Sequence, residues 1–175
     1  MLFRSRSSSA AAAVRDLRGS NFAVNSPHSN TGMNLPRRLF ASVANGKRFF
    51  NRVIVTGSHR ASMEAVRSGD ADAAAIDCVT FGLHAEYEPA AIRGLRILTH
   101  TEPSPSIPFV TSCSTGEGTV GALRRALVNF STRADFAPVR QALRITGIAV
   151  SNEAVYDVLL DYHAEAVALG YPHLA

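Results

Sequence analysis

The chain has 175 residues, a net charge of +4 and a pI of about 9.6, and 46% of its residues are hydrophobic and 18% charged. This composition is typical of a globular protein of one domain or two small lobes, and no apolar run reaches the length of a membrane span. The arginines are scattered without a basic and aromatic cluster, which argues against a nucleic-acid partner. The two cysteines, Cys78 and Cys113, form no metal-binding pattern, so we expect neither a metal nor a cofactor.

The N-terminal stretch Met1–Ala13 is rich in arginine, serine and alanine and has no continuous hydrophobic segment of signal-peptide length. It predicts a disordered tail over residues 1–16. A poor transit-like segment, or the wrong start of a longer protein, is the alternative interpretation.

Strands and helices alternate along the first half of the chain. Three short apolar runs predict strands, namely Asn21–Val24, Val53–Val55 and Ala73–Ile76. Apolar residues recur at helical spacing after the first two runs, from about Asn34 and from His59 onward. The third run is continuously apolar, as strands covered on both faces of a parallel sheet are. The rhythm therefore predicts an α/β fold with a parallel-rich sheet flanked by helices.

The second half of the chain contains less strand than its helices require. A strand at Leu95–Leu98 is followed by a crossover with prolines at 101–106 and by one further apolar run, Ile107–Val110. Two amphipathic helices follow, with apolar faces within Val120–Phe130 and Val155–Leu169. A lone strand cannot cover two such faces, so this part predicts half of a lobe and self-association through the uncovered helix faces.

A polar stretch, Asn25–Leu35, lies at the first strand-to-helix turn. Such a turn presents free N–H groups and the positive end of a helix dipole, which favour an anion. Its hydroxyl and amide side chains add neutral donors, Gly32 has no side chain to keep a ligand from the backbone, and no residue of the stretch is positively charged. The stretch is therefore either an oxyanion site built from hydrogen bonds or an ordinary polar loop that caps a helix.

The carboxyl ends of the three predicted strands meet at one edge of the sheet, where ligands bind in open α/β sheets. Ser58-His59 and Asp77 follow the second and third strands. His59 is either a helix-end residue or a hydrogen-bond donor to an oxyanion, and Asp77 is either a helix cap or a carboxylate for a ligand ammonium or hydroxyl. The candidate ligand-binding residues are Ser26, His28, Ser29, Asn30, Thr31, Gly32, Ser58, His59 and Asp77.

Six motifs occur in an order that resembles the phosphate, phosphite and phosphonate-type substrate-binding proteins of ABC transporters. They are Asp16-Leu17-Arg18-Gly19, Thr31-Gly32, Gly57-Ser58-His59, Ala65–Asp77, Leu95–Leu98 and Ile107-Pro108-Phe109. The resemblance implies a type II periplasmic binding protein with a ligand in a cleft between two lobes. Residues 17–103 would form one full lobe and 104–175 the crossover and C-terminal part of the other, whose N-terminal part has no counterpart here.

The resemblance also implies the function. It predicts the solute-binding component of an ABC importer, which would be periplasmic, would bind a small oxyanion or aminoalkyl phosphonate-like ligand, would work with a transporter permease and would catalyse nothing. By the same resemblance, the family's anion-gripping loop matches residues 29–32, its cleft histidine matches His59 and its carboxylate matches Asp77. Two alternatives remain open: an enzyme on the same fold with His59 as base and Asp77 as its orienting partner, or a sensory ligand-binding domain.

Overall fold

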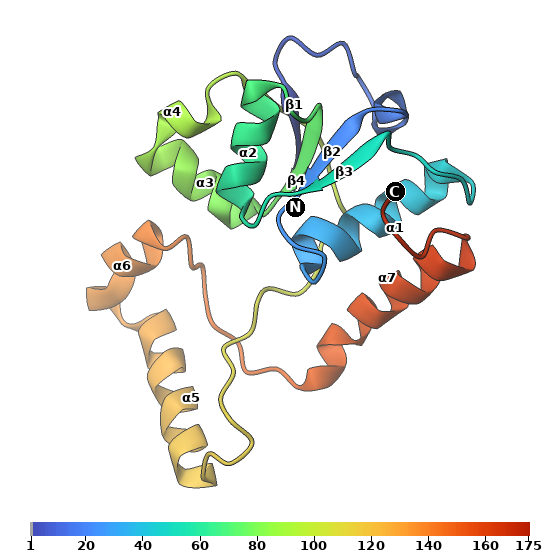
Figure 1. Ribbon diagram of the computed structural model, residues 1–175. Helices are drawn as coiled ribbons and strands as arrows, with labels where there is room; N and C mark the ends of the chain where they lie inside the picture. Colours follow the sequence, from blue (N-terminus) through green and yellow to red (C-terminus); the bar gives the residue numbers. More distant parts are fainter. Residues whose placement is uncertain (1) are drawn as a thin grey trace. The chain divides into compact units, whose positions relative to one another are not determined.

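The structure is a computed structural model that describes residues 2–175, with side chains from Ser5 onward. Contacts divide the chain into two units, one of residues up to Ser104 together with Asp157–Ala175, and one of Pro105–Tyr156 (Figure 1). The predicted lobes placed 157–175 with the crossover segment, whereas the contacts group it with the sheet. The assignment of these segments to two lobes stays a prediction.

The first unit is built around a five-stranded mixed sheet in the order β3-β2-β4-β1-β5. The strands are β1 (Leu2–Arg6), β2 (Asn21–Val24), β3 (Arg52–Val55), β4 (Ala73–Ile76) and β5 (Leu95–His100). Strand β2 pairs in parallel with β3 and β4, while β1 is antiparallel to both β4 and β5. Four strands therefore run in one direction and β1 in the other, and the predicted parallel-rich α/β fold is confirmed.

Strand β1 corrects the prediction of a disordered tail over residues 1–16. Its residues lie between β4 and β5, with Phe3 opposite Ala75 and Thr99. A 3-10 turn, Val14–Leu17, follows, and it buries Leu17. The prediction was wrong because the strand's partners lie about seventy to a hundred residues further along the chain, and the short segment Leu-Phe-Arg-Ser-Arg carries no local sign of such a pairing.

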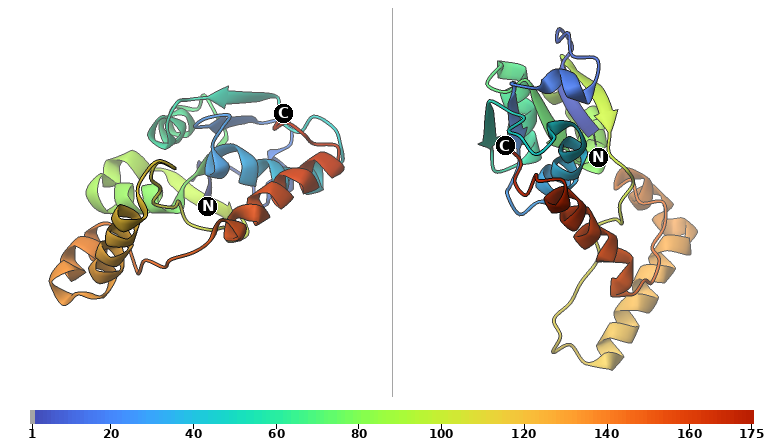
Figure 2. Two further views of the ribbon diagram at one scale, coloured as in Figure 1. Left: turned by 90° about the horizontal axis from the view of Figure 1, so that it is seen from below. Right: turned by 90° about the vertical axis from the view of Figure 1, so that its right-hand side faces the viewer.

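Helices cover both faces of the sheet (Figures 1 and 2). They are α1 (Leu35–Ala44), α2 (His59–Ser68), α3 (Cys78–Tyr87), α4 (Pro89–Ile92) and α7 (Asp157–Ala168) in the first unit. Helices α1 and α7 lie side by side over one face, and α2 packs on the other. Within residues 2–175, no helix has both the length and the apolar character that a membrane crossing needs.

Alternation along the strands divides the core into two halves. Phe22 and Ala73 face the α1 side, where they pack with Phe40, whereas Ala23 and Ala74 face the α2 side. All of these residues are buried. Strands that are buried on both faces need apolar residues at every position, which explains why β4 has the sequence Ala-Ala-Ala-Ile.

The second unit, Pro105–Tyr156, contains helices α5 (Glu117–Thr132) and α6 (Ala137–Ala142). The predicted strand Ile107–Val110 is not formed, and Ile107, Phe109 and Val110 are 85%, 69% and 83% exposed. A strand needs a partner strand to be stable, and the described residues of this unit supply none. Self-association through exposed apolar residues stays a prediction.

Two buried serines of the first unit differ in whether they have a partner. Ser5 in β1 is fully buried and its Oγ has no hydrogen-bond partner among the described residues, whereas Ser62 in α2 is equally buried and lies 2.6 Å from Thr56 Oγ1. We therefore expect Ser5→Ala to raise the free energy of unfolding by about 1 kcal/mol and Ser62→Ala to lower it by a similar amount. Urea unfolding followed by circular dichroism measures both, and equal signs for the two variants would contradict the assignment.

Candidate functional site

The loop after β2 ends in a single π-helical turn, Asn30–Asn34, which leads into α1. Ser29 caps the turn, because its Oγ accepts a hydrogen bond of 2.9 Å from the Gly32 N–H. The wider turn has a local cause. Pro36 has no N–H for a regular helical bond to Gly32, and its ring would crowd the carbonyl of that residue. π-turns of this kind are frequent at functional sites.

Helix α2 begins at the end of β3 and places His59 next to this loop. Ser58 caps the helix by accepting a hydrogen bond of 3.1 Å from the Ala61 N–H. His59 Nε2 lies 3.3 Å from Thr31 Oγ1, which in turn lies 3.4 Å from Ser29 Oγ. The structure therefore brings Ser29, Thr31 and His59 into one hydrogen-bonded row, which joins the carboxyl ends of β2 and β3 as predicted from the topology.

The surroundings of His59 favour its neutral form. Burial lowers the pKa of the ring, and this outweighs the negative charge of Asp77 and the backbone of Ala75, which both act to raise the pKa. The Nδ1 atom is buried and has no partner within hydrogen-bond geometry in the described part of the chain. At neutral pH His59 therefore contributes a hydrogen-bonding ring and no positive charge.

Asp77 follows β4 and caps α3, because its Oδ1 accepts a hydrogen bond of 2.8 Å from the Thr80 N–H. This hydrogen bond engages one oxygen of the carboxylate, and the negative charge of Asp77 still acts on His59. No hydrogen bond joins His59 to Asp77 in the structure of residues 2–175. An enzyme that uses His59 as a base oriented by Asp77 would need that bond, so the geometry gives the catalytic alternative no support.

The other predicted loop residues make local contacts. The Ser26 Oγ accepts from the His28 N–H at 3.2 Å, and the His28 side chain is exposed. The Asn30 Oδ1 accepts from the Asn34 Nδ2 at 3.2 Å. These residues stabilise the loop, and the structure does not join Ser26, His28 or Asn30 to His59.

Gly32 is needed for packing against Asn25. A Cβ atom at this position would lie 1.7 Å from Asn25 Oδ1, so the Asn25 side chain fills the space next to Gly32. Asn25 Oδ1 is buried and lacks a partner among the described residues. Sequence reasoning missed this role of Asn25, and the only available signal was a polar residue directly after a buried strand.

The row has no cation of its own. No arginine or lysine occurs from Asn25 to Leu35, and the one charged group that acts on His59 is a carboxylate. No group of three or more His, Cys, Asp or Glu side chains among the described residues could hold a metal ion. The site can therefore offer hydroxyl, imidazole and backbone N–H groups to a ligand, together with one carboxylate that can accept a hydrogen bond.

Three solved structures resemble this chain in fold. A binding-protein component of a phosphonate ABC transporter from Pseudomonas aeruginosa is 18% identical over 96% of this chain and 57% of its own, with a TM-score of 0.83. PhnD1 from Prochlorococcus marinus, in complex with methylphosphonate, is 16% identical over 94% of this chain and 65% of its own, with a TM-score of 0.74. XAC2383 from Xanthomonas citri, bound to chloride, is 18% identical over 96% and 65%, with a TM-score of 0.67.

At these identities the likeness establishes the fold, and the chain spans 57–65% of the length of these structures. The curated proteins include no match. The sequence itself matches one family over residues 1–156, described as the periplasmic substrate-binding proteins of phosphonate ABC transporters. Because the match spans most of the chain, the protein belongs to the family of phosphonate ABC transporter substrate-binding proteins.

Proposed function

We propose that this chain supplies the ligand-binding edge of a solute-binding component of an ABC importer, and that it binds a small oxyanion or phosphonate-like ligand without catalysis. The observation that carries the proposal is the row of Ser29, Thr31 and His59 at the carboxyl ends of β2 and β3, with the charge of Asp77 acting on it. Family membership supports the binding role, a periplasmic location and a transporter permease as partner.

The chemistry of the row narrows the ligand class. An oxyanion would be held by neutral donors, since no arginine or lysine occurs from Asn25 to Leu35 and the lowered pKa of His59 favours its neutral form. The negative charge of Asp77 would repel a fully ionised phosphate. The ligand that fits best therefore carries a proton donor of its own, such as the ammonium group of an aminoalkyl phosphonate or the hydroxyl of a protonated oxyanion.

Thermal melts of the chain with methylphosphonate and with 2-aminoethylphosphonate test the proposal. A ligand that binds only the folded state at about 100 times its Kd stabilises that state by ~2.7 kcal/mol. Thr31→Val removes the hydroxyl that joins Ser29 to His59 and preserves shape. If it weakens binding about tenfold, within the range for a lost hydrogen bond, the stabilisation by either ligand falls to ~1.4 kcal/mol.

The substitution Asp77→Asn is expected to change the affinities for the two ligands in different ways. Asparagine caps a helix as well as aspartate does, so α3 is expected to remain intact while the negative charge is removed. We expect weaker binding of 2-aminoethylphosphonate and unchanged or tighter binding of methylphosphonate. Thr132→Val, on the exposed end of α5, is the control for the threonine change. A Thr31→Val variant that binds both ligands as the parent does would refute the proposed site.

A further inference from the structure

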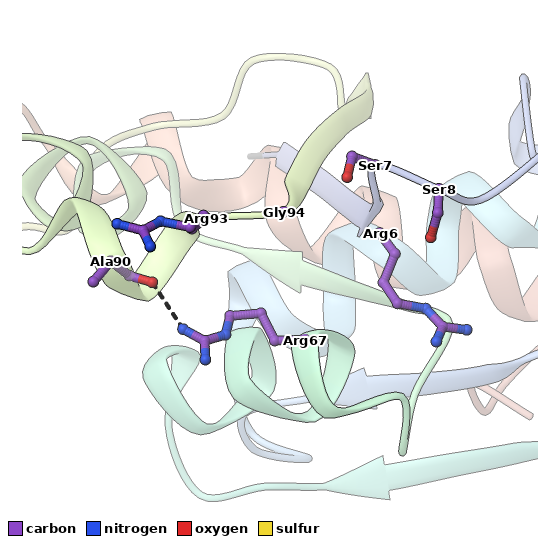
Figure 3. A pocket seen from close by; sticks show the side chains of 7 residues that line it. All are labelled: Arg6, Ser7, Ser8, Arg67, Ala90, Arg93 and Gly94. Carbon is purple, nitrogen blue, oxygen red and sulfur yellow. Dashed lines mark hydrogen bonds between the residues drawn. The ribbon is translucent and has the colours of Figure 1, made fainter.

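A second polar feature lies at the opposite edge of the sheet. A hollow of about 440 Å³ is lined by residues that include Arg6, Ser7, Ser8, Arg67, Arg93 and Gly94 (Figure 3). We call it the arginine hollow. Strand β1 is antiparallel to its neighbours, and its last residues pair with Ala73 and Leu95, the first residues of β4 and β5. The hollow therefore lies at the amino ends of β4 and β5, away from the row that contains His59.

The lining of the hollow contains three guanidinium groups and no carboxylate. Arg6 has a distant ion pair with Asp72 at 3.7 Å, and Arg67 has one with Glu64 at 3.3 Å. Arg93 forms no ion pair with any residue whose side chain the structure describes. Asp72 and Glu64 lie outside the lining and partly offset the charges of Arg6 and Arg67, so Arg93 carries the one charge of the lining that no described carboxylate pairs with.

Two of the arginines make contacts within the protein that restrict their positions. The Arg67 Nη1 donates a hydrogen bond of 2.7 Å to the carbonyl oxygen of Ala90, drawn as a dashed line in Figure 3. Arg6 lies against Gly69, where an added Cβ would be 3.1 Å from Arg6 Nη1. The backbone on the two sides of the hollow is joined by a hydrogen bond of 2.7 Å, which the Ser7 N–H donates to the Gly94 carbonyl oxygen. A ligand would therefore meet side chains that are already partly ordered, which reduces the entropy lost on binding.

We propose that the arginine hollow binds a small molecule that carries two phosphate groups. Guanidinium groups recognise phosphate oxygens with paired hydrogen bonds, and three of them line the hollow without a carboxylate in the lining. The hollow has the volume of a small-molecule site, larger than one oxyanion needs. Figure 3 shows Arg67 and Arg93 toward one side and Arg6 toward the other, an arrangement that suits two linked phosphates. The ligand is either free diphosphate or a nucleoside diphosphate.

Calorimetric titration of the 175-residue chain with pyrophosphate, at constant ionic strength, tests the proposal. Arg93→Gln removes the unpaired guanidinium without breaking an ion pair, and Arg67→Gln removes the ordered one. We expect each to weaken pyrophosphate binding at least about tenfold, because a hydrogen bond to a charged group is lost. Arg124→Gln on α5, an exposed arginine outside the hollow, is the matched control and is expected to leave the affinity unchanged.

The arginine hollow and the site that contains His59 can be tested independently, because each variant is expected to affect only one of the two ligands. Arg93→Gln is expected to keep the full response to methylphosphonate, and Thr31→Val the full affinity for pyrophosphate. Unchanged pyrophosphate binding in Arg93→Gln and Arg67→Gln, or an equal loss in Arg124→Gln, would overturn the arginine hollow as a site. A parallel titration with ADP identifies the source: tighter binding than pyrophosphate indicates a nucleoside diphosphate, and equal or weaker binding indicates free diphosphate.

Discussion

Replacing Phe40 by alanine is expected to lower the free energy of unfolding by about 3–5 kcal/mol, a large part of the stability of a domain of this size. Phe40 is fully buried in α1, and its ring centroid lies 5.3 Å from that of Phe22, 5.0 Å from Phe49 and 4.6 Å from Phe50. These rings join α1 to the face of β2. Truncation would remove apolar burial and three ring contacts and leave a cavity that the neighbouring rings cannot fill.

Urea unfolding followed by circular dichroism measures the effect of Phe40→Ala. The midpoint is expected to fall by at least about 1 M, given slopes of roughly 1–3 kcal/mol per molar urea. Phe109→Ala is the matched control, since the same atoms are removed from a side chain that is 69% exposed, and a change within about 0.5 kcal/mol is expected. Similar losses in the two variants would show that the rings around Phe40 do not form the core.

Strands β2 to β5 could be predicted from the sequence because each contains a run of mostly apolar residues, although only β2 and β4 are largely buried. The bounds predicted for β2 and β4 are those observed, and β3 and β5 are longer than predicted by one and two residues. A strand that is buried on both faces is apolar throughout, and the run Ala-Ala-Ala-Ile of β4 has this pattern. The helix after His59 was predicted for the same reason, from apolar residues at helical spacing.

Strand β1 and the segment Ile107–Val110 could not be predicted, for opposite reasons. β1 is a short segment with two arginines that forms a strand between β4 and β5, and this place is visible only in the folded sheet. Ile107–Val110 has strand-forming residues but no strand beside it among the described residues of its unit. Strand formation depends on partners that lie far away in the sequence, and local propensity does not report them.

The closeness of the loop after β2 to His59 could be predicted from the sequence, whereas the contacts of the individual side chains could not. The rule that carboxyl ends of parallel strands meet at one edge led to the loop after β2 and to His59, and the structure places Thr31 and His59 3.3 Å apart. The rule says nothing about the directions of neighbouring side chains. The exposed His28 and the local bonds of Ser26 and Asn30 were therefore beyond its reach, as was the packing of Asn25 against Gly32.

That packing makes Gly32→Ala the second substitution with a large expected effect. The new methyl carbon would lie 1.7 Å from Asn25 Oδ1 and 3.2 Å from Ser29 Oγ, distances that force one or both side chains to move. Because Asn25 is partly buried and Ser29 caps the π-turn, overpacking is expected to cost about 1–3 kcal/mol or more. It is also expected to disturb the row of Ser29, Thr31 and His59, and so to weaken phosphonate binding more than Thr31→Val does.

A control substitution at another glycine and a compensating substitution at Asn25 test whether Gly32→Ala acts through the clash with Asn25. Gly118 is the second residue of α5 and has nothing within 4 Å of an added Cβ, so Gly118→Ala is expected to stabilise the helix by at most about 0.5 kcal/mol. Asn25→Ala removes the atoms that the new methyl group would strike, and Asn25 Oδ1 has no hydrogen bond to lose within residues 2–175. The double variant Asn25→Ala/Gly32→Ala is therefore expected to recover most of the lost stability.

Urea unfolding of the four members of this cycle measures the coupling between the two positions. A favourable coupling of about 1 kcal/mol or more means that Gly32 is glycine because Asn25 occupies the adjacent space. If the two substitutions change the free energy of unfolding additively, Gly32→Ala destabilises the protein through the loop backbone and not through the Asn25 side chain. In that case methylphosphonate binding should fail in the double variant as in Gly32→Ala, whereas relief of a side-chain clash should restore binding and stability together.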